Sequence, residues 1–278
     1  LAEEVGQVMG SELAALGFNL YIGPTLDVAD TANLEAARYA GPSLFGGDQY
    51  WVGELGQAYV AGLHSGSQGR LSVIARNFPG LGSADRSPEE EVSTVRKSLE
   101  QLKQIELAPF FTVTSAEDPA SQVDGLMIAH IRFQGFQGNI RATTRPVSFD
   151  ATALEQLLAV EPIANWRTAG GLTISNCLGS RAVRYFFDPT GQTFDAFNIA
   201  RTAFLAGNDL LYVHDFKAPL DQSAYETITR TLQLFASKYE EDSVFANVWT
   251  PLCCASLGQS SNFMAALTQK LSSLTQQA

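Results

Sequence analysis

The chain has 278 residues, of which 45% are hydrophobic and 17% are charged, and its formal net charge is −11. This composition is typical of a globular protein, and the length suffices for one large domain or two small ones. An acidic balance of this size argues against a nucleic-acid partner, which would require a basic surface. No apolar run approaches the roughly 18 residues that a membrane span needs.

The order of apolar periods along the chain predicts alternating helices and strands. In chain order these are a helix at 1–16, a strand at 18–27, a helix at 52–64, a strand at 71–75, a helix at 87–105, a strand at 124–130, a helix at 151–160, a strand at 171–176, a helix at 194–206, a strand at 209–214, and helices at 224–239 and 263–274. Alternation without an internal repeat predicts a mostly parallel sheet, either a barrel or doubly wound.

The helix at 87–105 is predicted from its first turn. Ser87 is a suitable N-cap, Pro88 fits the first turn, and Glu89–Glu91 would face the positive end of the helix dipole. The three cysteines, Cys177, Cys253 and Cys254, have the spacing of neither a disulfide framework nor a metal site, so we expect no metal.

Polar side chains follow the predicted strand at 71–75. Arg76 and Asn77 come directly after it, and the run Phe78-Pro79-Gly80-Leu81-Gly82 must then form a sharp loop, because glycine reaches backbone angles that other residues avoid. The carboxyl ends of parallel strands are where α/β proteins build their active sites. The sequence therefore predicts a site around Arg76 and Asn77.

The run from Arg76 to Gly82 resembles the Lys-His-Phe-Pro-Gly-x-Gly signature of family 3 glycoside hydrolases, with Lys changed to Arg76 and His to Asn77. Members of this family are retaining β-glucosidases and β-N-acetylglucosaminidases with a barrel-type catalytic domain. The resemblance implies a (β/α)8 TIM-type barrel, a carbohydrate ligand, and no metal or organic cofactor.

The resemblance is strongest over residues 1–215, and we expect residues 1–278 to form a single barrel domain. Family members usually have a strand and a helix before the position of Leu1, so we expect the barrel to be incomplete and the chain truncated at its N-terminus. Many members carry a second domain, which makes a second domain or a partner subunit an expected partner. The compartment stays open between secreted, cell-envelope and cytoplasmic.

The position of the family's nucleophile is changed. In the family an Asp follows a strand in a Ser-Asp pair, and the matching run here is Thr173-Ile174-Ser175-Asn176. Retaining glycosidases need a carboxylate nucleophile and an acid/base group about 5–5.5 Å apart. The amide of Asn176 has nearly the same size but is uncharged and a poor nucleophile; its alternative role is to cap a strand end or turn.

Further family positions match less completely. Asp27 matches an Asp that binds sugar hydroxyls, and His130 matches a pocket His in a Met-x-Ala-His run, although each could instead have a structural role as a cap or a core histidine. Ser43 stands where the family has a sugar-binding Arg, which would remove a bidentate donor. Arg76 keeps the charge of the family Lys but not its shape, and Asn77 still donates and accepts hydrogen bonds.

The acid/base residue is matched only by a loop. N-acetylglucosaminidase members use an Asp-x-His pair shortly after the Pro-Gly-x-Gly run, and Asp85 stands at the position of that Asp, with Ser87 in place of the His. Glucosidase members take this group from their second domain. Alternatively, Asp85 and Arg86 form a local ion pair or cap the helix that follows.

Three functions fit these changes together. The chain could be a hydrolase of terminal β-linked glucosyl or N-acetylglucosaminyl residues whose Asn and Ser pocket residues are not native. It could be a catalytically silent relative that binds a sugar. It could also be a barrel recruited as a structural subunit, which predicts no affinity for sugars.

Overall fold

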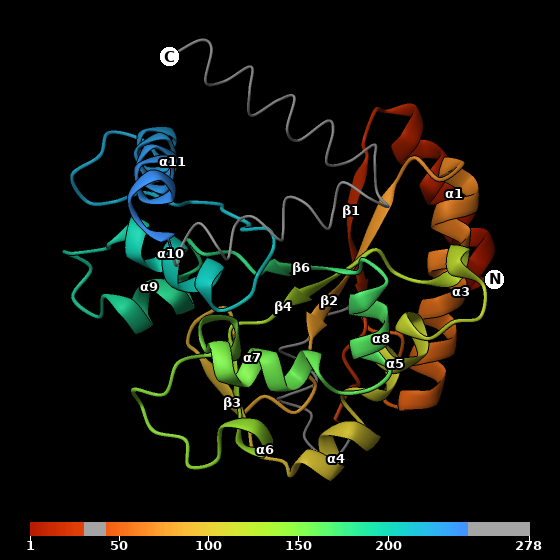
Figure 1. Ribbon diagram of the computed structural model, residues 1–278. Coiled ribbons are helices and arrows are strands. Elements are labelled where there is room, and N and C mark those ends of the chain that lie inside the picture. Colours follow the sequence, from red (N-terminus) through yellow and green to blue (C-terminus); the bar gives the residue numbers. More distant parts are fainter. Residues whose placement is uncertain (31–42, 244–278) are drawn as a thin grey trace. The chain divides into compact units, whose positions relative to one another are not determined.

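The computed structural model describes residues 1–30 and 43–243 (Figure 1). The chain divides into two compact units, residues 1–232 and 233–278, and the strands of the described residues all lie in the first unit. The predicted helix at 263–274 and the cysteines Cys253 and Cys254 lie outside the described residues.

A parallel sheet forms the centre of the first unit. Its strands follow the order of the chain: β1 (Leu20–Thr25), β2 (Ser72–Phe78), β4 (Gly125–Ile128) and β6 (Leu172–Ser175). The strands β3 (Ser93–Val95) and β5 (Ile131–Phe133) form a second, two-stranded parallel sheet. An α/β fold with a parallel sheet is thus confirmed.

Helices connect these strands, as parallel pairing requires. Their bounds are α1 Ala2–Ala15, α3 Gln49–Ser67, α4 Leu99–Gln104, α5 Ala108–Thr114, α6 Gln134–Gln137, α7 Ala151–Leu158, α8 Ile163–Thr168, α9 Arg181–Phe187, α10 Ala196–Leu205 and α11 Ala224–Glu241, with 3₁₀ turns η1 Pro119–Ser121 and η2 Val147–Phe149.

Both faces of the central sheet are buried. Successive side chains of a strand point to opposite sides, so each strand contributes side chains to both faces. On one face, Val73 and Ala75 of β2 join the main core beneath the helices. On the other face, Ile74, Met127 and Ile174 form a separate apolar cluster. A parallel bridge between Ile174 and Leu210 extends the pairing beyond β6. Within the described residues no pairing joins Leu210 back to β1, so barrel closure stays a prediction.

Two predicted elements are wrong. Residues 87–91 form a turn instead of starting a helix, β3 follows, and the helix begins only after Ser98. The Ser98 side chain accepts from the backbone N–H of Gln101 (3.3 Å), and the Gln101 side chain accepts from the backbone N–H of Ser98 (3.0 Å). This reciprocal cap satisfies two N–H groups, which the turn at Ser87 does not offer. The predicted strand at 209–214 contributes only the bridge at Leu210.

Helices α1 and α3 pack through glycines, so that their backbones touch (Figure 1). A Cβ atom on Gly6 or Gly10 of α1 would lie 2.3 Å from a carbonyl oxygen of α3, and one on Gly62 or Gly66 of α3 would lie 2.1 or 2.0 Å from a carbonyl oxygen of α1. Side chains are therefore excluded at all four positions.

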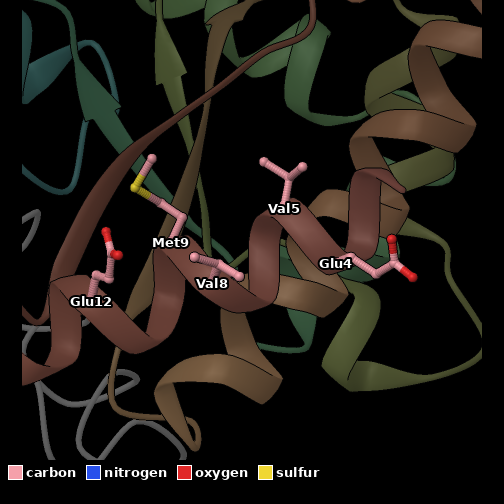
Figure 2. Close-up of a pocket in the computed structure, with 5 residues that line it drawn as sticks. All are labelled: Glu4, Val5, Val8, Met9 and Glu12. Carbon is pink, nitrogen blue, oxygen red and sulfur yellow. The ribbon is translucent and has the colours of Figure 1, made fainter.

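The opposite face of α1 is apolar and exposed. Val5 and Val8 are 50% and 61% exposed, and with Met9 they form a shallow groove bordered by Glu4 and Glu12 (Figure 2). None of the predicted site residues lines this groove. No helix in the described part of the chain combines the length and apolar character needed to cross a membrane.

The glycine contact gives a first prediction. Gly10→Ala should lower the free energy of unfolding by roughly 1–3 kcal/mol, because the added methyl overpacks against the carbonyl of Leu63. Helix propensity alone would favour alanine by about 1 kcal/mol. Urea unfolding measures the difference, with Ser11→Ala, at an exposed position of the same helix, as the control. A stabilised Gly10→Ala protein would contradict the observed packing.

Candidate functional site

The buried carboxylate of Asp27 organises the carboxyl edge of the sheet. Asp27 follows β1 and is 0% exposed. One oxygen accepts from the side-chain amide of Asn77 (2.7 Å) and the other from the backbone N–H of Leu81 (2.6 Å). Asp27 thereby joins the end of β1 to the end of β2 and to the loop that follows it.

The electrostatics of Asp27 are dominated by its burial. Desolvation raises the pKa of the Asp27 carboxyl to about 6 from an ordinary value of 3.8, although the hydrogen bonds from Asn77 and Leu81 lower it. The positive charge of Arg76 acts in the same direction as these bonds, and the negative charge of Glu106 opposes them. The carboxyl group therefore changes its protonation state near pH 6, well above the range of an exposed aspartate.

The loop after β2 needs its glycines. Gly80 has φ +120°, a conformation that favours glycine, and its N–H donates to the carbonyl oxygen of Asn77 (2.7 Å). A Cβ atom on Gly82 would lie 1.7 Å from the carbonyl oxygen of Val28, so this backbone passes directly against the segment that carries Asp27. The Pro-Gly-x-Gly pattern thus fixes the distance between the two strand ends.

His130 ties the end of β4 to the end of β6. Its Nε2 lies 3.0 Å from the carbonyl oxygen of Cys177, which can only accept, so Nε2 carries the proton. Its Nδ1 then accepts from the hydroxyl of Ser148 (2.7 Å). Burial lowers the pKa of His130 to about 4, although hydrogen bonds to the backbone of Cys177 and Asn176 raise it. The imidazole is therefore neutral, and it stacks on Phe149 with 5.2 Å between centroids.

Asn176 stands directly after β6, partly exposed. Its backbone N–H donates to the carbonyl oxygen of Ile128 (2.9 Å), which places it beside the end of β4. Its side-chain oxygen accepts from the backbone N–H of Cys177 (2.7 Å). The side-chain oxygen is thus engaged by the neighbouring backbone, and the amide keeps an NH2 group for other partners.

The structure brings most of the predicted site residues to one edge. Arg76 is exposed beside Asn77, with its Nε 3.4 Å from the Asn77 side-chain oxygen. Ser43 is exposed at the start of the second described segment. Asp85 bonds elsewhere: its carboxylate accepts from the N–H of Thr94 (2.8 Å) and pairs with Arg86.

One group of residues was missed by sequence reasoning. Glu106 is 0% exposed, accepts from the hydroxyl of Ser83 (2.7 Å), and pairs with Lys97. The available signal was a lone acid between apolar neighbours, Ile105 and Leu107, at a position where burial is expected. Among the described residues, no three His, Cys, Asp or Glu side chains are grouped as metal ligands.

Comparison with known proteins shows the family. The glycosyl hydrolase family 3 N terminal domain matches residues 1–212, and the chain therefore belongs to glycoside hydrolase family 3. A beta-hexosaminidase from Pseudomonas aeruginosa is 27% identical over 161 residues, which are 58% of this chain and 43% of that protein. A beta-hexosaminidase from Hydrogenovibrio crunogenus is 26% identical over 214 residues, 77% of this chain and 51% of that protein. The chain thus spans about half the length of these relatives.

Solved structures agree on the fold. A family 3 beta-N-acetylglucosaminidase from Paenibacillus sp. superposes with a TM-score of 0.69 at 24% identity, over 91% of this chain and 42% of that one. A beta-N-acetylhexosaminidase from Beutenbergia cavernae gives a TM-score of 0.69 at 17% identity, over 92% of this chain and 67% of that one.

The hydrogen bonds of Asp27 give a second prediction. Asp27→Ala should lower the free energy of unfolding by roughly 2–5 kcal/mol, because it leaves two buried donors unpaired. Asp27→Asn should cost only about 1 kcal/mol, since its oxygen serves Leu81 and a flipped Asn77 amide accepts from its NH2. The flip gives up only the long bond (3.4 Å) from the exposed Arg76 to the Asn77 oxygen. Chemical denaturation of both variants tests this; equal costs would show that the two bonds carry no stability.

The buried imidazole gives a third prediction, on pH. The folded pKa of His130 is lowered from 6.5 to about 4, so its contribution is fully present above pH 6.5 and is lost as the pH falls through 4. The loss amounts to about 3 kcal/mol. Unfolding curves between pH 7.5 and pH 4 should therefore fall more steeply for the wild type than for His130→Gln. His214→Gln, at an exposed histidine, is the control; parallel curves for wild type and His130→Gln would contradict the assignment.

Proposed function

We propose that this chain is a family 3 domain that binds a carbohydrate at the carboxyl edge of its sheet and does not hydrolyse it. Membership of the family supports a carbohydrate ligand. The proposed binding groups are Arg76, Asn77 and the NH2 of Asn176 at the edge, with Asp27 and His130 holding the strand ends beneath. Ser43, which is exposed, is a further proposed contact. These donors and acceptors suit sugar hydroxyls.

The observation that carries this proposal is the amide at position 176. A retaining mechanism forms a covalent bond between the sugar and a carboxylate. The Asn176 oxygen is uncharged and already accepts from the N–H of Cys177, so it neither attacks the sugar nor stabilises positive charge that develops on it. Asp85, the matching acid/base residue, is held by Thr94 and Arg86.

Retaining hydrolysis of terminal β-linked glucosyl or N-acetylglucosaminyl residues is the second candidate. It is favoured by the similarity to beta-hexosaminidases and by Asp85, whose loop follows the Pro-Gly-x-Gly run directly. This function would need a carboxylate at position 176 and release of Asp85 from its ion pair.

We propose, further, that the parallel sheet belongs to a (β/α)8 barrel and that residues 1–278 form a single barrel domain. The likeness to family 3 structures and the bridge at Leu210, which continues the sheet beyond β6, support this architecture. A second domain or a partner subunit would complete the site, since the chain spans about half of its relatives.

The fourth prediction tests the amide directly. Hydrolysis of aryl β-glucoside and aryl β-N-acetylglucosaminide is measured for the wild type, for Asn176→Asp and for Asn165→Asp, a control at an exposed position of α8. Turnover should appear only in Asn176→Asp, at least roughly 10³-fold above the wild type, because the carboxylate restores an activated group. The aryl leaving group departs without the proton that Asp85, held in its ion pair, would otherwise supply. Binding of N-acetylglucosamine to the wild type is followed by NMR.

The outcomes separate the two candidates. Equal turnover by the wild type and Asn176→Asp would refute the binding proposal and the role of position 176. Binding of the sugar without turnover by the wild type would support the proposal. A folded wild type that neither binds nor hydrolyses either sugar would overturn both candidates and leave the structural-subunit alternative.

A further inference from the structure

The loop between Pro79 and Ser83 is held between two buried carboxylates. On one side, the N–H of Leu81 donates to Asp27 (2.6 Å), and the backbone of Gly82 lies against Val28. This side of the loop therefore faces the candidate carbohydrate site. The position of Leu81 decides whether one oxygen of Asp27 is satisfied.

On its other side the same loop rests on Glu106. A Cβ atom on Gly80 would lie 2.9 Å from the Cβ of Glu106, and the hydroxyl of Ser83 donates to Glu106 Oε1 (2.7 Å). Lys97, which is 20% exposed in its side chain, pairs with the same oxygen. Thus a side chain that precedes α5 holds both ends of the Gly80–Ser83 segment.

We propose that Glu106, together with Lys97 and Ser83, is a positioning residue of the candidate carbohydrate site, which places the Gly80–Ser83 segment so that the Leu81 N–H meets Asp27. Glu106 acts through the loop and does not touch the ligand. The proposal rests on the proposed function only for its effect on sugar binding, because the contacts themselves are within the protein.

Stability alone does not account for this arrangement. A buried ion pair typically gains little over apolar residues of similar volume, because both charges lose their hydration. The loss of hydration is less well compensated here, since Oε2 of Glu106 has no hydrogen-bond partner among the described residues. A cluster that costs stability at a site edge is typical of residues retained for function.

The charge of Glu106 also reaches Asp27. The charged groups that act on Asp27 are Arg76, from β2, which favours its ionised form, and Glu106, which disfavours it. Glu106 is itself balanced by Lys97. Removing the charge of Glu106 alone would make Asp27 ionise at lower pH. Loss of the Leu81 hydrogen bond would make Asp27 ionise at higher pH, because that bond favours the ionised carboxylate. The direction of the shift therefore separates a positioning role of Glu106 from a purely electrostatic one.

The fifth prediction uses the Leu81 amide as the reporter, because its N–H donates to the titrating carboxylate. Its NMR signal is followed from pH 4 to pH 8 in the wild type, in Glu106→Gln, and in Glu100→Gln, a control at an exposed glutamate of α4. The midpoint should lie near pH 6 in the wild type and in the control, and at higher pH in Glu106→Gln, because a displaced Leu81 N–H no longer stabilises the ionised carboxylate. Binding of N-acetylglucosamine should weaken about tenfold in Glu106→Gln, for the loss of one positioned contact.

A midpoint in Glu106→Gln that is unchanged or lower, together with an unchanged Leu81 signal, would overturn the proposal. If Glu106→Gln does not fold, the double variant Lys97→Met with Glu106→Gln removes both charges, and the same upward shift is required of it. An upward shift in a chain whose wild type binds no sugar would uphold the positioning of Leu81 and refute the proposed function, so the two failures are distinguishable.

Discussion

A carboxylate removed from water must find donors, and the edge of this sheet is arranged around that requirement. Asp27 meets it with the Asn77 amide and the Leu81 N–H, which come from a different strand and from the loop beyond. The Pro-Gly-x-Gly loop has its shape because the backbone must approach Asp27 at Leu81 and Val28 at Gly82. The position of Arg76 at the surface follows, since it precedes Asn77 on the same strand.

The sequence was sufficient for the four strands of the central sheet and for the polar residues at their ends, because apolar runs followed by polar residues are local signals. It missed the short strands β3 and β5, and the strand expected at 209–214 is only a bridge at Leu210. It was not sufficient for contacts between distant segments: nothing local pairs His130 with Ser148 or Ser83 with Glu106. Ser87 and Ser98 both satisfy the local rule for a helix start. Because β3 lies between them, the helix begins after Ser98. Glu106 was missed because burial of a charge is visible only once the fold is known.

Family membership and the residue type at position 176 favour different functions. The family's fold is kept, whereas the side-chain oxygen of Asn176 accepts from the backbone N–H of Cys177, a bond that a carboxylate oxygen would accept equally well. Under our proposal that position 176 is that of the family's nucleophile, an amide in place of a carboxylate keeps this bond and removes the charge. Function can change here without any structural cost, and for this reason the fold alone does not decide between binding and hydrolysis.

The contact between α1 and α3 has a consequence for how this protein tolerates mutation. The two backbones touch at Gly6, Gly10, Gly62 and Gly66. The packing therefore requires that these four positions carry no side chain, and it does not rely on large side chains that fit together. Substitutions at the outward positions of α1 leave that packing unchanged, so α1 combines high mutational robustness with two sites of almost no tolerance, Gly6 and Gly10. Helix α3 has two more, Gly62 and Gly66. We expect related sequences to differ at the residues of the apolar groove before they differ at the glycines that set how α1 and α3 pack.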